Sequence, residues 1–171
     1  MRERNDLVTM HGNPLTLVGD DVKVGDAAPD FEVIDNDLAP VKLSSFSGKV
    51  CIFLSVPSLD TPVCDIEIRW FNEEATRLGP DVEIVTISMD LPFAQKRWCG
   101  AAGATHVKTL SDHREASFGT SYGVLIKELR LLARAVFVVD REGTVRHVQL
   151  VKDITDEPDY EAVLNAVKEL V

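Results

Sequence analysis

Clustered basic residues and long apolar runs are both missing from this chain. Its 171 residues include 18 Lys and Arg against 28 Asp and Glu, which gives a formal net charge of −10 at pH 7. Nucleic acids and anionic membranes attract basic patches, so this balance argues against both kinds of partner. No stretch approaches the roughly 20 apolar residues that cross a bilayer, and the opening MRERNDLV lacks the apolar core of a signal peptide. We therefore expect a cytoplasmic protein that binds neither nucleic acid nor membrane.

The motifs of several common chemistries are missing as well. The sequence contains no CxxC pair, no GxxxxGKS/T loop and no GxGxxG turn. These absences leave a thioredoxin-type redox pair, a P-loop and a dinucleotide site without support. The four histidines are scattered and form no HxxxH pair, so we expect neither a metal site nor a cofactor.

The most informative segment is PSLDTPVC, residues 57–64, because it places a cysteine in the first turn of a predicted helix. Residues 49–56, KVCIFLSV, are apolar and rich in β-branched side chains, which predicts a buried strand before it. Thr61 is predicted as the N-cap and Pro62 as the first helical residue. Apolar residues then recur at helical spacing until Gly79 and Pro80 end the helix: Cys64, Ile68, Phe71, Ala75 and Leu78.

This position favours a reactive thiol at Cys64. Unpaired backbone N–H groups and the helix dipole lower a thiol pKa from ~8.5 towards ~3.5–7.5. Asp65 and Glu67 act in the opposite direction, because negative charges disfavour a thiolate. A cation must offset them: Arg69 is expected to face solvent, whereas Arg134 begins an apolar strand, where an arginine needs a partner. The alternative is that Cys64 is a small buried residue without chemistry.

The other two cysteines are predicted to differ in role. Cys51 lies within the apolar strand and is expected to be an inert core residue. Cys99 lies near the end of a predicted helix, followed by Gly100 and Gly103, which make that end easy to fray. Cys99 is placed at the edge of the helix face that is expected to be buried. Its thiol is therefore either packed in the core or exposed for reaction. Permanent disulfides are rare in cytosolic proteins, so any bridge is expected to be transient or catalytic.

The remaining pattern predicts an α/β fold with a mixed sheet in a single domain, residues 1–171. A β-hairpin at about 7–17, turning at Gly12-Asn13, precedes the main part of the domain. Asp90 is expected to cap the helix that carries Cys99. The further elements predicted are strands at 31–34, 83–88 and 107–110, helices at 91–101, 114–118 and 160–171, and a hairpin formed by 133–140 and 144–151.

The spacing of Pro57, Thr61 and Cys64, PxxxTxxC, resembles the peroxiredoxins. Four further segments are similar to the thiol peroxidase subfamily: DLPFAQKRWCG around Cys99, SFGTSYGV at 117–124, ARAVFVVD at 133–140 and DEPDYEA at 156–162. The resemblance runs from the hairpin at residue 7 to the last helix. It implies a thioredoxin-like fold, a mixed central sheet flanked by helices, with the hairpin as an N-terminal extension, and a homodimer.

The resemblance also implies roles for individual residues. Cys64 would be the peroxidatic cysteine, with Thr61 holding the thiolate and the peroxide oxygen, Pro57 shielding the pocket from water and Arg134 beside the sulfur. Cys99 would be the resolving cysteine of the same subunit. Hydrogen peroxide and alkyl hydroperoxides would be the substrates and thioredoxin the reductant, in antioxidant defence and redox homeostasis.

Two other functions stay open at this stage. A peroxide-sensing redox switch would use the same cysteine pair without multiple turnover. A thioredoxin-like binding scaffold would carry structural cysteines only, and replacing Cys64 with serine would then change nothing.

Overall fold

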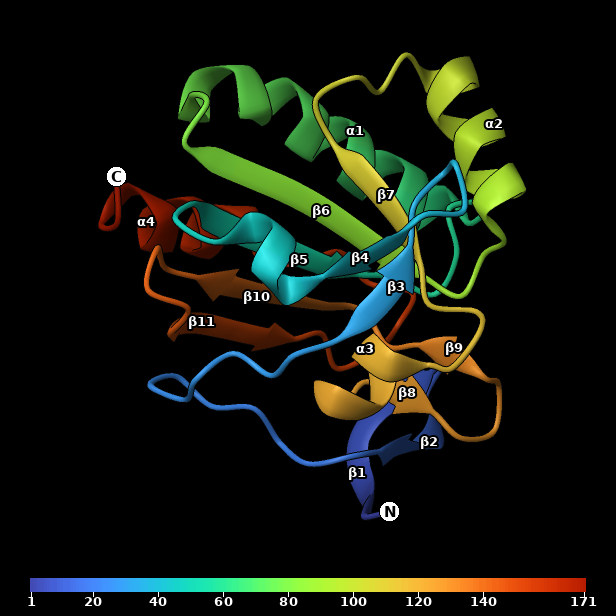
Figure 1. The fold of residues 1–171 in the computed structure, drawn as a ribbon. Helices are drawn as coiled ribbons and strands as arrows, with labels where there is room; N and C mark the ends of the chain where they lie inside the picture. The colour runs from blue at the N-terminus through green and yellow to red at the C-terminus, as the bar shows by residue number, and fades with distance from the viewer.

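The computed structural model describes residues 1–171 and contains two β-sheets and four α-helices (Figure 1). The larger sheet has seven strands in the order β11-β10-β5-β6-β7-β3-β4, and the smaller has four in the order β1-β2-β8-β9. The elements are β1 (Glu3–Met10), β2 (Asn13–Val18), β3 (Glu32–Ile34), β4 (Pro40–Lys42), the 3-10 helix η1 (Leu43–Phe46), β5 (Val50–Ser55), α1 (Pro62–Leu78), β6 (Val82–Ser88), α2 (Pro92–Ala102), β7 (Lys108–Ser111), α3 (Ser117–Ser121), β8 (Leu125–Ile126), β9 (Leu131–Leu132), β10 (Ala135–Val139), β11 (Val145–Leu150) and α4 (Tyr160–Lys168).

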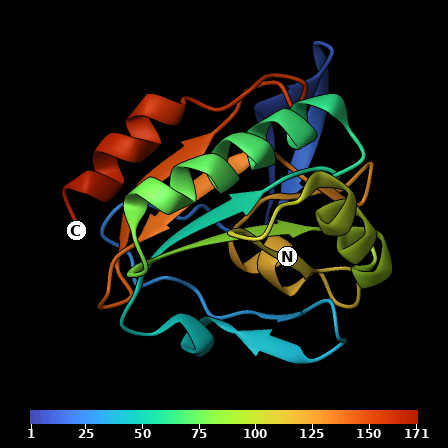
Figure 2. The ribbon, with the colours of Figure 1, turned by 90° about the horizontal axis from the view of Figure 1, so that it is seen from above.

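The seven-stranded sheet is mixed, as predicted. Strand β5 pairs in parallel with β6 and antiparallel with β10, and all six of its residues are buried. Its side chains alternate between two apolar layers, because successive residues of a strand point to opposite faces. Ile52 and Leu54 face α1 and α4, which lie side by side over one face of the sheet (Figure 2). Phe53 joins the aromatic cluster on the other face, together with Phe118 of α3.

Helix α1 confirms the predicted amphipathic stripe. Cys64, Ile68 and Phe71 are fully buried against the sheet, and Thr61 and Pro62 occupy the N-cap and first helical positions. The sequence pattern therefore places the helix start, and the cysteine on it, correctly.

The N-terminal hairpin is longer than predicted and belongs to a larger sheet. Its turn is at His11 and Gly12, both with positive φ, rather than at Gly12-Asn13, and its strands run from residue 3 to residue 18. Strand β2 also pairs with β8, and β8 with β9. These two strands have two residues each, too short for any alternating pattern to identify. Val8 and Leu17 of the hairpin join the same buried cluster as Phe53.

Two helix starts differ from the predictions. Leu91, not Asp90, is the N-cap residue of α2, because the Asp90 carboxylate is bound elsewhere. Helix α3 begins at Ser117 rather than at 114, since Ala116 adopts a left-handed conformation with φ 52°. The Asp112 carboxylate instead accepts hydrogen bonds from the first backbone N–H groups of this helix. No helix in the structure combines the length and apolarity needed to cross a membrane.

Candidate active site

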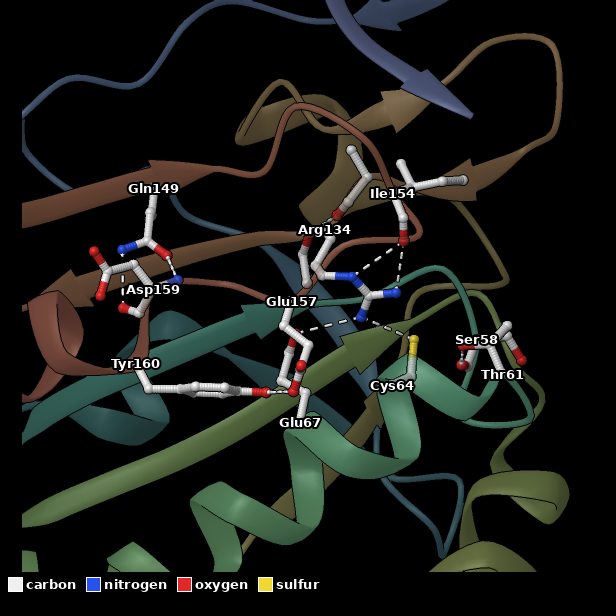
Figure 3. Close-up of polar contacts among 12 residues, drawn as sticks. Ser58, Thr61, Cys64, Glu67, Arg134, Gln149, Ile154, Glu157, Asp159 and Tyr160 are labelled. Atoms are coloured by element: carbon white, nitrogen blue, oxygen red, sulfur yellow. Dashed lines mark hydrogen bonds and ion pairs between the residues drawn. The ribbon is translucent and has the colours of Figure 1, made fainter. Parts of the chain in front are cut away.

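Cys64 and Arg134, 70 residues apart in the sequence, meet beneath the start of α1. The Cys64 side chain is fully buried, and its Sγ accepts a hydrogen bond of 3.1 Å from Nη1 of Arg134 (Figure 3). Arg134 directly precedes β10 and is itself only 1% exposed. A buried guanidinium held against a thiol is the cation that the sequence analysis required beside this helix.

The Arg134 guanidinium has two further partners. Nε and Nη2 both donate to the backbone carbonyl of Ile154, at 3.2 and 2.7 Å. Nη1, which contacts Cys64, also donates to Oε1 of Glu67 at 3.3 Å. One donor nitrogen is therefore shared between a thiol and a carboxyl group, both buried.

Burial dominates the electrostatics of this site. It raises the pKa of the Cys64 thiol above its ordinary value, while the Arg134 charge, the Thr61 hydroxyl and the Ser58 backbone act in the opposite direction. The expectation of a lowered thiol pKa from the helix start is therefore wrong for this closed geometry, because desolvation exceeds the favourable contacts. Burial likewise raises the pKa of Glu67 to about 7, against the effect of Arg134. The second carboxyl oxygen of Glu67 has no hydrogen-bond partner.

The loop before α1 is held by hydrogen bonds that the sequence pattern did not suggest. The Thr61 hydroxyl donates to the Ser58 carbonyl at 2.9 Å instead of capping the helix, and Pro57 is buried where β5 ends. The Asp90 carboxylate accepts from the Ser58 hydroxyl at 2.7 Å and from the Leu59 N–H at 2.9 Å. Asp90 thus ties the loop that presents Cys64 to the segment that begins α2.

The second cysteine of interest lies on a different helix from the first. Cys99 is half-buried on α2, its Sγ is 3.4 Å from the Thr109 hydroxyl, and all three cysteines are free thiols. Cys51 is 2% exposed and burial raises its pKa to about 12, which agrees with the prediction of an inert core residue. No group of ligating side chains in the structure is arranged to hold a metal ion.

Asp65, Arg69 and Trp98 form a latch between α1 and α2. Trp98 Nε1 and Arg69 Nε both donate to the Asp65 carboxylate, at 3.0 and 2.9 Å. Arg69 also donates to the Ala102 carbonyl at 3.3 Å and lies over the Trp98 ring. Arg69 is half-exposed and paired with Asp65. The cation beside Cys64 is therefore Arg134. The latch joins the immediate sequence neighbours of Cys64 and Cys99.

Residues 119–123, GTSYG, match the GxSxG motif, which the sequence analysis missed. In serine hydrolases this motif forms a sharp strand-to-helix turn with the serine at its tip. Here Ser121 is the last residue of the five-residue helix α3. The motif therefore carries no hydrolase site.

Comparison with known proteins identifies the family of this chain. The family model for redoxins matches residues 23–164. The thiol peroxidase of Halalkalibacterium halodurans is 56% identical over 161 residues, covering 94% of this chain and 96% of that protein. The thiol peroxidase of Bacillus subtilis is also 56% identical, over 164 residues, with 96% and 98% covered. This chain belongs to the thiol peroxidase family.

A solved structure supports the same assignment. The peroxiredoxin-like protein from Aquifex aeolicus superposes with a TM-score of 0.91 at 46% identity, covering 97% of this chain and 98% of that one. The fold is therefore the thioredoxin-like fold of the redoxins, as predicted. As a member of the thiol peroxidase family, the chain is an enzyme of the peroxiredoxin type.

Glu67 makes a pH-dependent contribution to stability. Its pKa of about 7 in the folded protein lies above the unfolded value, so the folded state binds the extra proton and loses stability as pH rises through 7. We expect the free energy of unfolding to fall from pH 5 to pH 8 by about 2 kcal/mol more in the native protein than in Glu67→Gln. Urea unfolding at both pH values measures the difference. Glu73→Gln, an exposed position on the same helix, is the control and should keep the native dependence. Equal slopes for all three proteins would contradict the buried acid.

Proposed function

We propose that this enzyme reduces hydrogen peroxide and alkyl hydroperoxides with the Cys64 thiolate as its nucleophile. The observation that carries the proposal is the 3.1 Å contact between Arg134 Nη1 and the buried Cys64 Sγ. A guanidinium within hydrogen-bond distance favours the thiolate over the thiol. The names of the relatives, thiol peroxidases, support the same reaction class.

In the first step the sulfur attacks one oxygen of the peroxide. An S–O bond forms, the O–O bond breaks, and the departing oxygen leaves with the electron pair and takes up a proton to give water or an alcohol. Cys64 becomes a sulfenic acid. Arg134 and the backbone N–H groups at the start of α1 stabilise the charge on the departing oxygen, and Pro57 excludes water. The Thr61 hydroxyl holds the thiolate and the peroxide oxygen, for which it turns away from the Ser58 carbonyl.

In the second step the Cys99 thiol attacks the sulfenic sulfur, forming a disulfide and releasing water. Bridged cysteines need Cα atoms within roughly 7 Å, yet here the two sulfurs have separate partners, Arg134 and Thr109. The first turn of α1 and the end of α2 therefore have to open, and the latch has to break. Gly103 closes α2 as a left-handed cap whose N–H donates to the Cys99 carbonyl, so this bond has to break as well.

An external dithiol then restores the two thiols by exchange. We propose thioredoxin for this role, and antioxidant defence as the physiological purpose. Assembly as a homodimer and a cytoplasmic location stay predictions from the sequence and the family resemblance.

The nucleophile is tested by Cys64→Ser. Peroxide consumption with a thioredoxin system should be lost, because a serine hydroxyl provides almost no anion at neutral pH, while Cys51→Ser, the control, should keep the native rate. The same assay on the native protein distinguishes an enzyme from a sensor. An enzyme consumes many equivalents of peroxide, whereas a sensor would stop after one. Activity of Cys64→Ser would refute the assignment.

The role of Cys99 is tested by Cys99→Ser. One equivalent of peroxide should react at close to the native rate, because only Cys64 takes part in that step, whereas turnover should fall by more than about tenfold. Sulfinic acid should accumulate at Cys64, since no thiol intercepts the sulfenic acid. Mass spectrometry of the oxidised native protein should find a Cys64–Cys99 linked peptide pair within a monomer. A covalent dimer, or a bridge to Cys51, would contradict the assignment.

The latch is tested by Trp98→Phe. The change keeps an aromatic ring but deletes the hydrogen bond to Asp65, which is worth about 1 kcal/mol and so favours opening about fivefold. The disulfide should form correspondingly faster after one equivalent of peroxide, measured by rapid quenching with an alkylating reagent. Trp70→Phe controls for the loss of an indole, because Trp70 stacks on Tyr160 on the side of α1 that faces α4. An unchanged rate in Trp98→Phe would mean that the latch does not limit opening.

A further inference from the structure

The loop between β11 and α4, residues 151–159, holds the guanidinium of Arg134 from the side opposite α1 (Figure 3). Its first residue, Val151, donates its N–H to the Arg134 carbonyl at 3.0 Å. Three residues later, the Ile154 carbonyl accepts from both Nε and Nη2. Because a guanidinium is planar and rigid, these two bonds determine the direction in which Nη1 points.

The same loop is bound to the N-terminal hairpin through the backbone of Thr9. The Thr9 N–H donates to the Lys152 carbonyl at 2.7 Å, and the Ile154 N–H donates to the Thr9 carbonyl at 2.9 Å. Thr9 and Asp153 thereby form a parallel β-bridge. The peptide unit on one side of Ile154 is held by the hairpin, and the carbonyl on its other side is held by Arg134.

Asp153 reinforces this junction with its side chain. One carboxylate oxygen accepts from the Thr9 hydroxyl at 2.7 Å and from the Gly12 N–H at 3.0 Å. The other accepts from the hydroxyl and the N–H of Thr155, at 2.6 and 3.0 Å. These hydrogen bonds, led by those from Thr155, hold the pKa of Asp153 well below its ordinary value. A permanently charged carboxylate therefore joins the hairpin turn to the residues on either side of Ile154.

We infer that Thr9 and Asp153 are positioning residues for the peroxidase reaction, through which the N-terminal hairpin orients Arg134 towards Cys64. The inference rests on the proposed function. Neither side chain touches the thiol or a substrate; each acts by fixing the Ile154 carbonyl. Nη1 is shared between Cys64 at 3.1 Å and Glu67 at 3.3 Å, so a small rotation of the guanidinium exchanges a good contact with the sulfur for one with the carboxyl group. The hairpin thus contributes to reactivity as well as to packing.

The test compares variants that loosen the junction with one that changes the hairpin elsewhere. Thr9→Val removes only the hydroxyl bond and keeps the shape of the side chain, whereas Asp153→Ala removes all four side-chain bonds. Thr16→Val is the matched control, since its hydroxyl bonds to Asn5 within the same hairpin, away from the loop. Thr9→Ser retains the hydroxyl and should restore native behaviour. Arg134→Met sets the size of the effect when the guanidinium is absent.

Two measurements separate positioning from stability. The first is the pH profile of Cys64 alkylation by iodoacetamide, followed for the Cys64 peptide by mass spectrometry in the full-length protein, which requires no peroxide chemistry. The second is the rate constant for one equivalent of hydrogen peroxide by stopped flow. In Thr9→Val and Asp153→Ala we expect the alkylation profile to move to higher pH and the peroxide rate at pH 7 to fall by up to about tenfold. Thr16→Val and Thr9→Ser should match the native protein, whatever their unfolding temperatures.

The outcomes distinguish this inference from the proposed function. If Arg134→Met shifts the alkylation profile but Thr9→Val and Asp153→Ala do not, the hairpin has no positioning role and the inference alone is wrong. Should Asp153→Ala fail to fold, Thr9→Val decides by the same criterion. If Arg134→Met leaves both the profile and the peroxide rate unchanged, the proposed role of Arg134 is wrong and the inference is refuted with it.

Discussion

The site is organised around a single buried cation that faces a thiol and a carboxyl group. Arg134 is 1% exposed, and Cys64 and Glu67 are fully buried. Removing a charge from water costs several kcal/mol, so a buried guanidinium persists only when its donors are matched by well-placed acceptors. The Ile154 carbonyl takes Nε and Nη2, and only Nη1 is left for the two side chains of α1. The position of α1 on the sheet, the loop after β11 and the N-terminal hairpin all serve to keep this geometry.

The same desolvation limits the reactivity of the Cys64 thiol in the resting site. In the closed structure, burial raises the pKa of the Cys64 thiol, and Arg134 offsets only part of that effect. The thiolate is therefore favoured by contact with the cation, and any change that moves the guanidinium away from the sulfur removes the largest effect that opposes burial. Opposite this charged centre, the latch of Asp65, Arg69 and Trp98 holds α1 against α2. In the proposed reaction, the contacts of Arg134 would prepare the thiol for peroxide, and the latch would keep it apart from Cys99.

Local patterns predicted the elements on which the site is built. The apolar strand β5, the N-cap at Thr61 and the stripe beginning at Cys64 follow from side-chain spacing and turn chemistry alone, and the structure agrees with them. Side-chain spacing does not show which distant groups a polar side chain will bond to. Asp90 has the position of a helix cap but bonds to Ser58 and Leu59. Glu67 looks like an ordinary acid near the start of a helix, yet packing buries it against Arg134. The two-residue strands β8 and β9 are defined by pairing, of β8 with β2 and of β9 with β8, which no short-range pattern encodes.

Glu67 has a physical role that follows from the order of the proposed steps. When Cys64 leaves its resting position to meet Cys99, Arg134 stays behind, because its main anchor is the Ile154 carbonyl and not α1. A buried guanidinium that loses its partner would be destabilised by about 3–5 kcal/mol. Glu67, whose Oε1 lies 3.3 Å from Arg134 Nη1 in the resting structure, is then the acidic side chain left beside the guanidinium, and with a pKa of about 7 it is partly ionised at neutral pH. Glu67 would thus supply a carboxylate to pair with the cation once Cys64 has moved away. That accounts for an acid in a position where, on its own, it would only disfavour the thiolate.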